Sequence, residues 1–312
     1  MKLFHFITKM KRILVIYYTQ SGQLKKIIDS ILGRMMENEE FQIDIERLQP
    51  IPDFPFPWGE QFFDCFPESV KGIPCQLEPV SFNPEQEYDL IILGYQPWYL
   101  SPSIPISAFL KSKTAKKVLK GRNVVTIIGA RNMWTRSQQI IKKYLIDLKA
   151  HLVGNIALVD RSNNYIAGFT IIRWLISGIK GPSLFLPEAG VSEKDIRAAA
   201  KFGQILEKAI NQHSYENLQD QLIQHKAVRI KYHLTCIEKN ARKIFDIFAD
   251  YILKKGDAHD PKRKGRIRHF KIYLLFVFFV VQPVFSFIFI IKRWVLYPLT
   301  QKEINYYKNI KL

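Results

Sequence analysis

The stretch Arg12-Ile-Leu-Val-Ile-Tyr-Tyr-Thr-Gln-Ser-Gly-Gln-Leu24 joins a short apolar run to a polar loop. The run is too short for a typical helix and is rich in Ile, Val and Tyr, which predicts a buried strand of a parallel sheet. After the loop, apolar residues return at helical spacing: Leu24, Ile27, Ile28, Ile31, Leu32, Met35 and Met36. The stretch therefore predicts a strand, a tight loop and a helix.

The loop has the composition of a phosphate-binding turn. Backbone N–H groups at the start of a helix attract an anion, and the helix dipole adds to that attraction. Thr19 and Ser21 can each add a hydroxyl group, and Gly22 lets the backbone come close to a ligand. An ordinary strand-to-helix turn with a polar cap has the same composition, so the loop alone does not decide between the two.

Four more segments follow the pattern of strands. Residues 41–48 alternate apolar and polar, as in an edge strand, and 88–95, 123–129 and 151–159 are apolar. The helix before the last of these carries its apolar residues inward, namely Ile140, Ile141, Tyr144, Leu145 and Leu148. Strands that alternate with helices predict an α/β fold with a doubly wound five-stranded parallel sheet. Ligands of such sheets bind past the carboxyl ends of the strands, where we expect loops 19–23, 96–103 and 130–135.

We expect the sheet domain to cover residues 12–211, with insertions at 49–82 and 162–190. The first insertion is rich in proline and aromatic residues, and proline excludes a central strand or a helix interior. It reads as an ordered segment that covers something, or as a structural flap without a ligand role. The second insertion contains an apolar stretch, 165–179, that is short for a bilayer span. Ser192-Glu-Lys-Asp195 resembles a capping box and predicts a helix through about Asn211.

The C-terminal part divides by composition. We expect a helical extension at 212–260, with a helix or a pair of helices from about 215 to 255, a basic linker at 261–271, an uncharged apolar run at 272–291 and a short tail at 292–312. The net charge is +18, and residues 226–271 hold 14 Lys and Arg against 5 Asp and Glu. Three cysteines, Cys65, Cys75 and Cys236, give neither a metal spacing nor an even disulfide set, which fits a reducing compartment.

The run 272–291 is long enough to cross roughly 30 Å of hydrocarbon. Lys292, Arg293, Trp294 and Tyr297 follow it as interface anchors, and Pro283 predicts a kink or a re-entrant turn. A spanning helix, an embedded helix that does not cross, and a core or partner-binding helix remain open. The stronger basic cluster precedes the run, which places the sheet domain on the cytoplasmic face of the inner membrane. A membrane explains the basic block better than nucleic acid does, since no nucleic-acid motif is present.

Large aromatic side chains gather in the loops after the third and fourth strands. Trp98, Tyr99 and Trp134 would cost free energy if they were exposed there, which favours a site for a flat ring. Gln96 and Asn132 could bond the polar edge of such a ring. Arg131 could offset negative charge on it, or form a surface salt bridge instead. No Gly-x-Gly-x-x-Gly follows the first strand, which argues against a classical NAD domain.

Thr19-Gln-Ser-Gly-Gln-Leu24 and residues 88–105 resemble the flavodoxin family over about residues 12–160, plus the helix near 192–211. The resemblance implies a flavodoxin-like fold and FMN, with its phosphate in the first loop and its ring between the loops after the third and fourth strands. Leu24 departs from the hydroxyl residue common at the end of that loop, which removes one phosphate contact. The cofactor contacts that the resemblance implies are Thr19, Gln20, Ser21, Gly22, Gln23, Leu24, Gln96, Pro97, Trp98, Tyr99, Leu100, Gly129, Arg131, Asn132 and Trp134.

Residues 55–58, 93–105, 128–134 and the apolar tail also resemble a bacterial group named dialkylresorcinol condensing enzymes, associated with dialkylresorcinols and flexirubin pigments. Condensation of acyl thioesters usually needs a positioned nucleophilic cysteine, and none of the three cysteines lies on a recognisable nucleophile turn. The fold suits the oxidative aromatisation of a dialkylcyclohexanedione better, in which a flavin takes a hydride and a base removes a proton. Tyr95, Tyr99 and His151 are candidates for that base by position only.

The resemblance thus implies a membrane-associated FMN-dependent oxidoreductase with a lipid-like substrate. NAD(P)H as electron donor or NAD(P)⁺ as acceptor is compatible with it, as are a pathway ketosynthase or acyl carrier protein as partner and an oligomeric state. One alternative is an NAD(P)H:quinone reductase or an electron carrier on the same fold. Another is a non-enzymatic membrane scaffold that has lost the cofactor, which the departure at Leu24 would allow.

Overall fold

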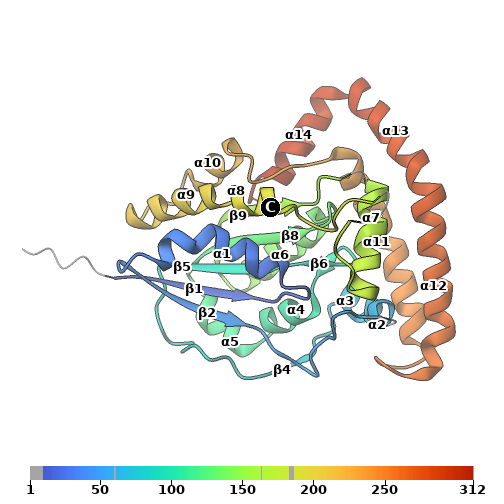
Figure 1. Ribbon diagram of the computed structural model, residues 1–312, viewed down its shortest axis with the longest axis horizontal. Helices are drawn as coiled ribbons and strands as arrows, with labels where there is room; N and C mark the ends of the chain where they lie inside the picture. The colour runs from blue at the N-terminus through green and yellow to red at the C-terminus, as the bar shows by residue number, and fades with distance from the viewer. Residues whose placement is uncertain (1–9, 60, 163, 183–185, 312) are drawn as a thin grey trace, which may run out of the picture.

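A parallel sheet forms the centre of the computed structural model, which describes residues 10–311 apart from 60, 163 and 183–185. The five strands lie in the order β2-β1-β5-β8-β9. Their bounds are Phe41–Arg47 for β2, Lys11–Tyr17 for β1, Leu90–Tyr95 for β5, Asn123–Ala130 for β8 and His151–Val159 for β9. This is the strand order of the flavodoxin-like doubly wound sheet. The predicted fold class is therefore confirmed (Figure 1).

Burial along the strands follows the sequence patterns. Ile13 to Ile16 of the central strand β1 are fully buried, because helices cover both faces of the sheet. The strand β2 pairs with β1 alone, from Lys11 opposite Phe41 to Tyr17 opposite Arg47. Its burial alternates only in part, as expected at an edge.

Helix α1, Gln23–Met36, packs against α8, Glu193–Ala198, and α9, Ala200–Asn211. The crossing is close, since a Cβ on Gly203 would lie 1.9 Å from the Ile31 carbonyl oxygen. The Ser192 hydroxyl accepts a hydrogen bond from the Asp195 N–H at 3.1 Å, so the predicted cap is confirmed. The remaining flanking helices are α4, Ile104–Leu110, α5, Lys113–Leu119, and α6, Thr135–Asp147.

Both predicted insertions contain regular structure. The first includes β3, Pro50–Ile51, α2, Gln61–Asp64, α3, Phe66–Lys71, and β4, Gln76–Leu77. The second contains α7, Asn164–Ser177. A hairpin of β6, Pro97–Trp98, and β7, Ser101–Pro102, follows the third strand of the large sheet. The extension after α9 is a pair of helices, α10, Leu218–Gln224, and α11, Tyr232–Leu253.

The C-terminal run belongs to a helix of 35 residues, Pro261–Val295, the single one in the described part of the chain that is long and apolar enough to cross a membrane. It comprises η1, Pro261–Arg263, α12, Lys264–Phe276, the π turn η2, Val277–Val281, and α13, Gln282–Val295. A last helix, α14, Tyr297–Lys308, follows. In Figure 1 the long helix runs across the ends of the sheet strands, and α14 returns toward the sheet.

The linker predicted for this region is wrong, and of the kink or re-entrant turn predicted at Pro283 the structure contradicts the re-entrant turn. Residues 261–271 are not a linker: they form the first turns of the long helix, and the Asp260 carboxylate accepts a hydrogen bond from the Lys262 N–H at 2.8 Å to cap it. Pro283 does not turn the chain back either. The π turn just before it takes up the mismatch that a missing N–H creates, so the helix continues to Val295.

Candidate functional site

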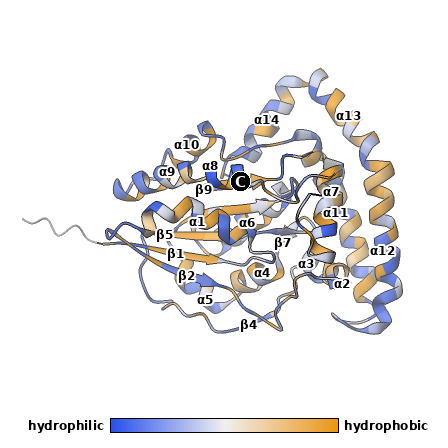
Figure 2. Ribbon diagram, in the orientation of Figure 1, coloured by the Kyte–Doolittle hydropathy of each residue, from blue (hydrophilic) through white to orange (hydrophobic). Residues whose placement is uncertain are grey.

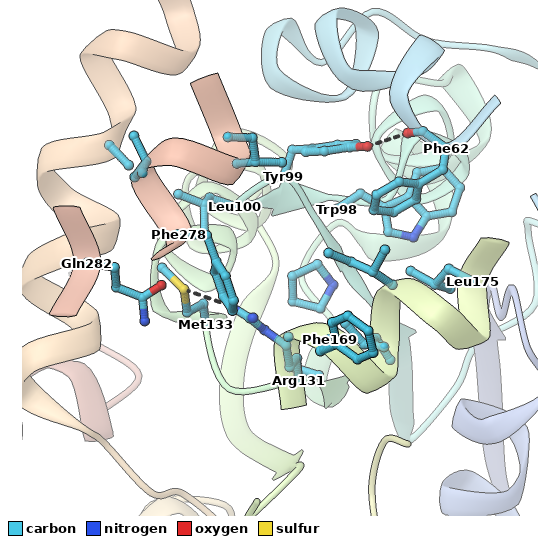
Figure 3. A pocket seen from close by; sticks show the side chains of 18 of the residues that line it. Phe62, Trp98, Tyr99, Leu100, Arg131, Met133, Phe169, Leu175, Phe278 and Gln282 are labelled. Atoms are coloured by element: carbon cyan, nitrogen blue, oxygen red, sulfur yellow. Dashed lines mark hydrogen bonds between the residues drawn. The ribbon is translucent and has the colours of Figure 1, made fainter. Parts of the chain in front are cut away.

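A cavity of about 530 Å³ lies past the carboxyl ends of the sheet strands. The loops after β1, β5 and β8 form one side, and α7, α11 and the long helix form the other (Figure 3). Its volume is in the range of small-molecule sites, about 300–1,000 Å³. The predicted contacts that line it are Gln20, Ser21, Gln23, Gln96, Pro97, Trp98, Tyr99, Leu100, Gly129 and Arg131. Thr19, Gly22, Leu24, Asn132 and Trp134 are not among its lining residues in the described part of the chain.

The first turn of α1 has free capacity for an anion. Gly22 is its N-cap with a φ of 78°, a left-handed conformation that glycine adopts at little cost. No side chain caps this end, and no acidic residue lies in its first turn. The Thr19 hydroxyl is buried and has no hydrogen-bond partner among the described residues. One N–H of the loop is already occupied, because Gln20 N donates to Gln96 Oε1 at 2.9 Å.

Gln23 and Leu24 have structural positions in this loop. The Gln23 amide exchanges two hydrogen bonds with the Val191 backbone, at 3.0 and 2.9 Å, and so holds that segment over the start of α1. The Leu24 side chain is fully buried and would be in contact with a Cβ at Gly94 or Gly129. Leu24 is therefore a core residue, and its side chain is not a cofactor contact.

The loop after β5 places its aromatic residues on the cavity wall. Trp98 packs edge-on against Tyr18 and Trp58, with ring centroids 5.7 and 4.6 Å apart. The Tyr99 hydroxyl donates to the Phe62 carbonyl oxygen (Figure 3). Tyr99 and Leu100 have φ values of 48° and 64°, so the hairpin turn is left-handed at two non-glycine residues. Because the first insertion supplies Trp58 and Phe62, this segment does cover the site.

The loop after β8 contributes Arg131 and Met133 to the cavity. Trp134 does not stack on a ligand there: it is 1% exposed at the N-cap of α6 and packs in the core. Asn132 is buried beside it, and neither of its amide atoms has a partner among the described residues. Neither side chain is among the described residues that line the cavity.

Two cationic residues among those described, Arg131 and Lys271, line the cavity, and Arg131 is the one that the loop after β8 supplies. Its guanidinium lies 5.7 Å from the centroid of the Phe278 ring, and its Nη2 is 3.3 Å from Met133 Sδ (Figure 3). Burial lowers the pKa of Arg131 to about 10, and the more distant Asp160 and Glu238 oppose that shift. Among the ion pairs of the described residues none involves Arg131, so the predicted surface salt bridge is absent there. A largely desolvated cation without a paired carboxylate favours an anionic ligand.

The three candidates for the catalytic base lie in different environments. His151 is the first residue of β9 and so lies at the amino end of a parallel strand, opposite the cavity. Tyr95 is buried and donates to Gln138 Oε1 at 2.6 Å, and burial raises its pKa. Tyr99 lines the cavity, but burial raises its pKa as well, so it stays protonated as a hydrogen-bond donor.

Sequence reasoning missed the far wall of the site. The long helix supplies Tyr273, Phe278 and Gln282, and α11 supplies Ile237 and Asn240. A signal in the sequence could have found this wall: the spacing of the polar residues within the apolar run indicates which face of the helix is turned toward the protein.

Glu238 was missed too: its carboxylate is buried and accepts a hydrogen bond from the Arg136 N–H at 2.8 Å at the start of α6. Burial raises the pKa of Glu238 to about 7.

Neither a metal centre nor a reactive thiol is present in the described part of the chain. No group of three or more His, Cys, Asp or Glu side chains could hold a metal ion there. Burial raises the pKa of Cys75 to about 11 and also raises that of Cys65, so both thiols remain protonated at neutral pH.

No protein-family model matches this chain, and no curated protein does. Among solved structures, it is similar to a flavoprotein in complex with FMN from Lactobacillus acidophilus, at 18% identity and a TM-score of 0.36, over 47% of this chain and 93% of that one. It is also similar to oxidised flavodoxin 1 from Bacillus cereus, at 16% identity and a TM-score of 0.36, over 64% and 98%. The strand order defines the class: this is a protein of the flavodoxin-like fold with a long apolar C-terminal helix.

Proposed function

We propose that this protein is an FMN-dependent oxidoreductase that acts on a lipid-like substrate at a membrane surface. The observation that carries the proposal is the composition of one cavity. It joins the start of α1, which has no side-chain cap among the described residues, to an apolar chamber with Arg131 in its wall. A phosphate, a flat ring and an apolar chain therefore each meet suitable chemistry in one space.

The residues present fit FMN in most respects. The N–H groups at the start of α1 and the unpartnered Thr19 hydroxyl would hold the phosphate. The ring would lie between the loop of Trp98 and Tyr99 and the loop of Gly129 and Arg131. One contact is lost, since the Gln20 N–H already bonds Gln96. The chemistry that bound FMN would supply is that of a hydride acceptor.

The chain's own residues have separate tasks in such a reaction. Apolar walls from α7 and the long helix would exclude water and hold alkyl chains. Arg131 would bind the anionic oxygen of an enolised cyclohexanedione, which fixes the ring to be oxidised. Conversion of a dialkylcyclohexanedione to a dialkylresorcinol removes one hydride and one proton. We propose this aromatisation as the reaction, in a pathway of dialkylresorcinol type.

An enzyme fits the cavity better than an electron carrier does. A carrier must leave a flavin edge within reach of its redox partner. Here Phe62 of α2, Phe169 of α7 and Phe278 of the long helix all lie over the carboxyl edge of the sheet (Figure 3). Substrate enclosed in this way is shielded from water, as catalysis on an apolar ring requires.

The test is a spectrum followed by an assay. Full-length protein purified in detergent should carry a yellow flavin, and heat should release FMN that chromatography identifies. The flavin of that protein should then be bleached by an alkylated cyclohexane-1,3-dione, with the resorcinol as product. Protein that stays colourless after soaking with FMN would contradict the cofactor. Bleaching by NADPH with quinone turnover and no dione oxidation would favour a quinone reductase.

A further inference from the structure

In the apolar run of the long helix, the polar side chains face the protein and the apolar side chains face outward. This is the reverse of a surface helix on a soluble protein. Within residues 272–291, the polar side chains are Tyr273, Gln282 and Ser286, and all three lie on the inner, less exposed face. The outward face is apolar and open, with Phe287 66% exposed. Figure 2 shows the apolar residues along α12 and α13. The exposed apolar residues of the run are Ile272, Leu275, Phe276, Phe279, Val280, Val284, Phe285, Phe287, Ile288, Ile290 and Ile291. Three of them, Leu275, Phe279 and Phe285, also line the rim of the cavity.

The amino end of the long helix is fixed to the sheet domain. Arg263 is fully buried, and its guanidinium donates to the Glu68 carboxylate at 2.7 and 3.0 Å and forms an ion pair with the Asp64 carboxylate at 3.0 Å. Seven residues on, the buried ring of Phe270 stacks on that of Phe66 at 3.6 Å between centroids. Asp64, Phe66 and Glu68 belong to the first insertion, so this end lies against α2 and α3.

The carboxyl end is fixed to the same domain through α14. Ile304 is buried against Tyr232 and Cys236 of α11. The Lys142 ammonium on α6 donates to the carbonyl oxygens of Asn309 and Lys311 at 2.7 and 3.0 Å. Both ends of the long helix are thus attached to the sheet domain, the amino end through Arg263 and Phe270 and the carboxyl end through Ile304 of α14.

We propose that the long helix lies in the plane of an anionic lipid leaflet, with its outward face embedded and both of its ends on the side of the sheet domain. This mode deepens the membrane part of the proposed function and does not depend on FMN. An amphipathic helix in this position inserts its apolar face about 5–10 Å. Basic residues at both ends suit lipid phosphates, namely Lys262, Lys264, Arg266, Arg268, Lys271, Lys292 and Arg293.

A spanning helix would require a different structure. Its two ends would have to lie about 30 Å apart on opposite sides of the hydrocarbon. The contacts of α14 with α6 and α11 would then be lost, including the burial of Ile304 and both hydrogen bonds of Lys142.

The embedded mode brings the bilayer next to the cavity. The same helix lines the cavity with its inner face, through Val277, Phe278 and Val281. One helix diameter, about 10 Å, therefore separates the cavity from the lipid. A substrate with alkyl chains would enter beside the helix and would not pass through water.

The deciding experiment measures which side each end faces. Two variants, Glu216→Cys on the sheet domain and Lys302→Cys on α14, are made in a Cys75→Ser background and expressed in a bacterium. Cys65 and Cys236 stay in place because both are buried, and the background without an added cysteine gives the baseline of labelling. Inverted inner-membrane vesicles are then treated with a membrane-impermeant maleimide. We expect both positions to be labelled to a similar extent without detergent. Labelling of the α14 position only after permeabilisation, with the domain position labelled throughout, would show a spanning helix and overturn the proposal.

A flotation assay supplies the second readout. Purified protein is mixed with vesicles of phosphatidylglycerol and phosphatidylcholine. Phe287→Glu on the outward face should reduce the floated fraction roughly tenfold. Ile146→Glu, at an equally open apolar position on α6, is the control and should float as the wild type does. If the wild type fails to float and is a dimer in solution, the apolar face binds a second copy and the proposal is wrong. The flavin spectrum of the same sample reports on the cofactor independently.

Discussion

Replacing Arg131 by Leu should stabilise the protein without ligand and weaken its binding of an anionic ligand. Burial lowers the pKa of this guanidinium from 12.5 to about 10. The lowered value means that the charged form is disfavoured in the folded state, and the penalty persists at every pH below about 10. A shift of this size corresponds to about 3 kcal/mol at 1.36 kcal/mol for each pKa unit.

Lost contacts reduce the expected gain. The cation–π contact with Phe278 contributes about 0.5–1 kcal/mol. The net stabilisation should be about 2 kcal/mol, which is a rise in Tm of roughly 4 °C at the lower end of the usual conversion. Thermal unfolding in detergent without added ligand measures it. Arg122→Leu removes an exposed pair with Glu87 and should change stability by less than about 1 kcal/mol, as a control.

Binding should change in the opposite direction. Titration with an alkylated cyclohexane-1,3-dione above the pKa of the dione should show at least tenfold weaker binding in Arg131→Leu than in the wild type. Opposite signs for stability and binding are the mark of a charge kept for a ligand. A variant that is less stable by more than 1 kcal/mol, or that binds the dione as the wild type does, would refute this reasoning.

Three further predictions follow from buried groups. Thr19→Ala should leave the Tm within about 2 °C, because the hydroxyl has no partner among the residues that the structure describes, and should weaken FMN binding about tenfold by fluorescence titration. The pKa of Glu238 is raised to about 7, so its contribution to the stability of the folded state is present below pH 4.5 and is lost as the pH rises through 7. In urea unfolding between pH 5 and 8, the wild type should lose about 2–3 kcal/mol of stability relative to Glu238→Gln. Arg263→Met leaves the carboxylates of Asp64 and Glu68 without their cation and should lower the free energy of unfolding in denaturant by about 3–5 kcal/mol. Adding Glu68→Gln to this variant should recover stability.

The sheet was predictable from the sequence because each strand is a short apolar run between polar loops. His151–Val159 agrees with the predicted fifth strand at both ends, and the predicted cap at Ser192 is present. The edge position of β2 followed from its alternation. These are local patterns, and local patterns carry most of the information on a parallel α/β sheet.

The site was predictable only where it is made of local loops. Gln96 and Arg131 reach the cavity from loops that follow apolar strands. Trp134 was misplaced because the turn into α6 buries its ring, and residue type does not show that turn. Leu24 lies on the helix face that packs on the sheet, so helical spacing predicted its place in the core better than the loop motif predicted a phosphate contact.

The far wall could not be predicted, since it depends on contacts between distant parts of the chain. Arg263 bonds Glu68 across 195 residues, and Phe278 lies against Gly168 of α7. An uncharged run of this length also has the composition of a membrane-spanning helix. Only the return of α14 to the domain shows that both ends of the helix lie on one side of the fold.

The π turn Val277–Val281 bears on how this helix tolerates insertions and deletions. A π turn holds one residue more than an α turn, so it corresponds to a single inserted residue. Deleting one residue there would convert the π turn into regular α-helix and leave the orientation of everything beyond it nearly unchanged. A deletion in α12 would instead rotate everything beyond it by about 100° around the helix axis, and Gln282 and Ser286 would move away from the inner face. The π turn is therefore the place where this helix can lose one residue and still keep its inner and outer faces.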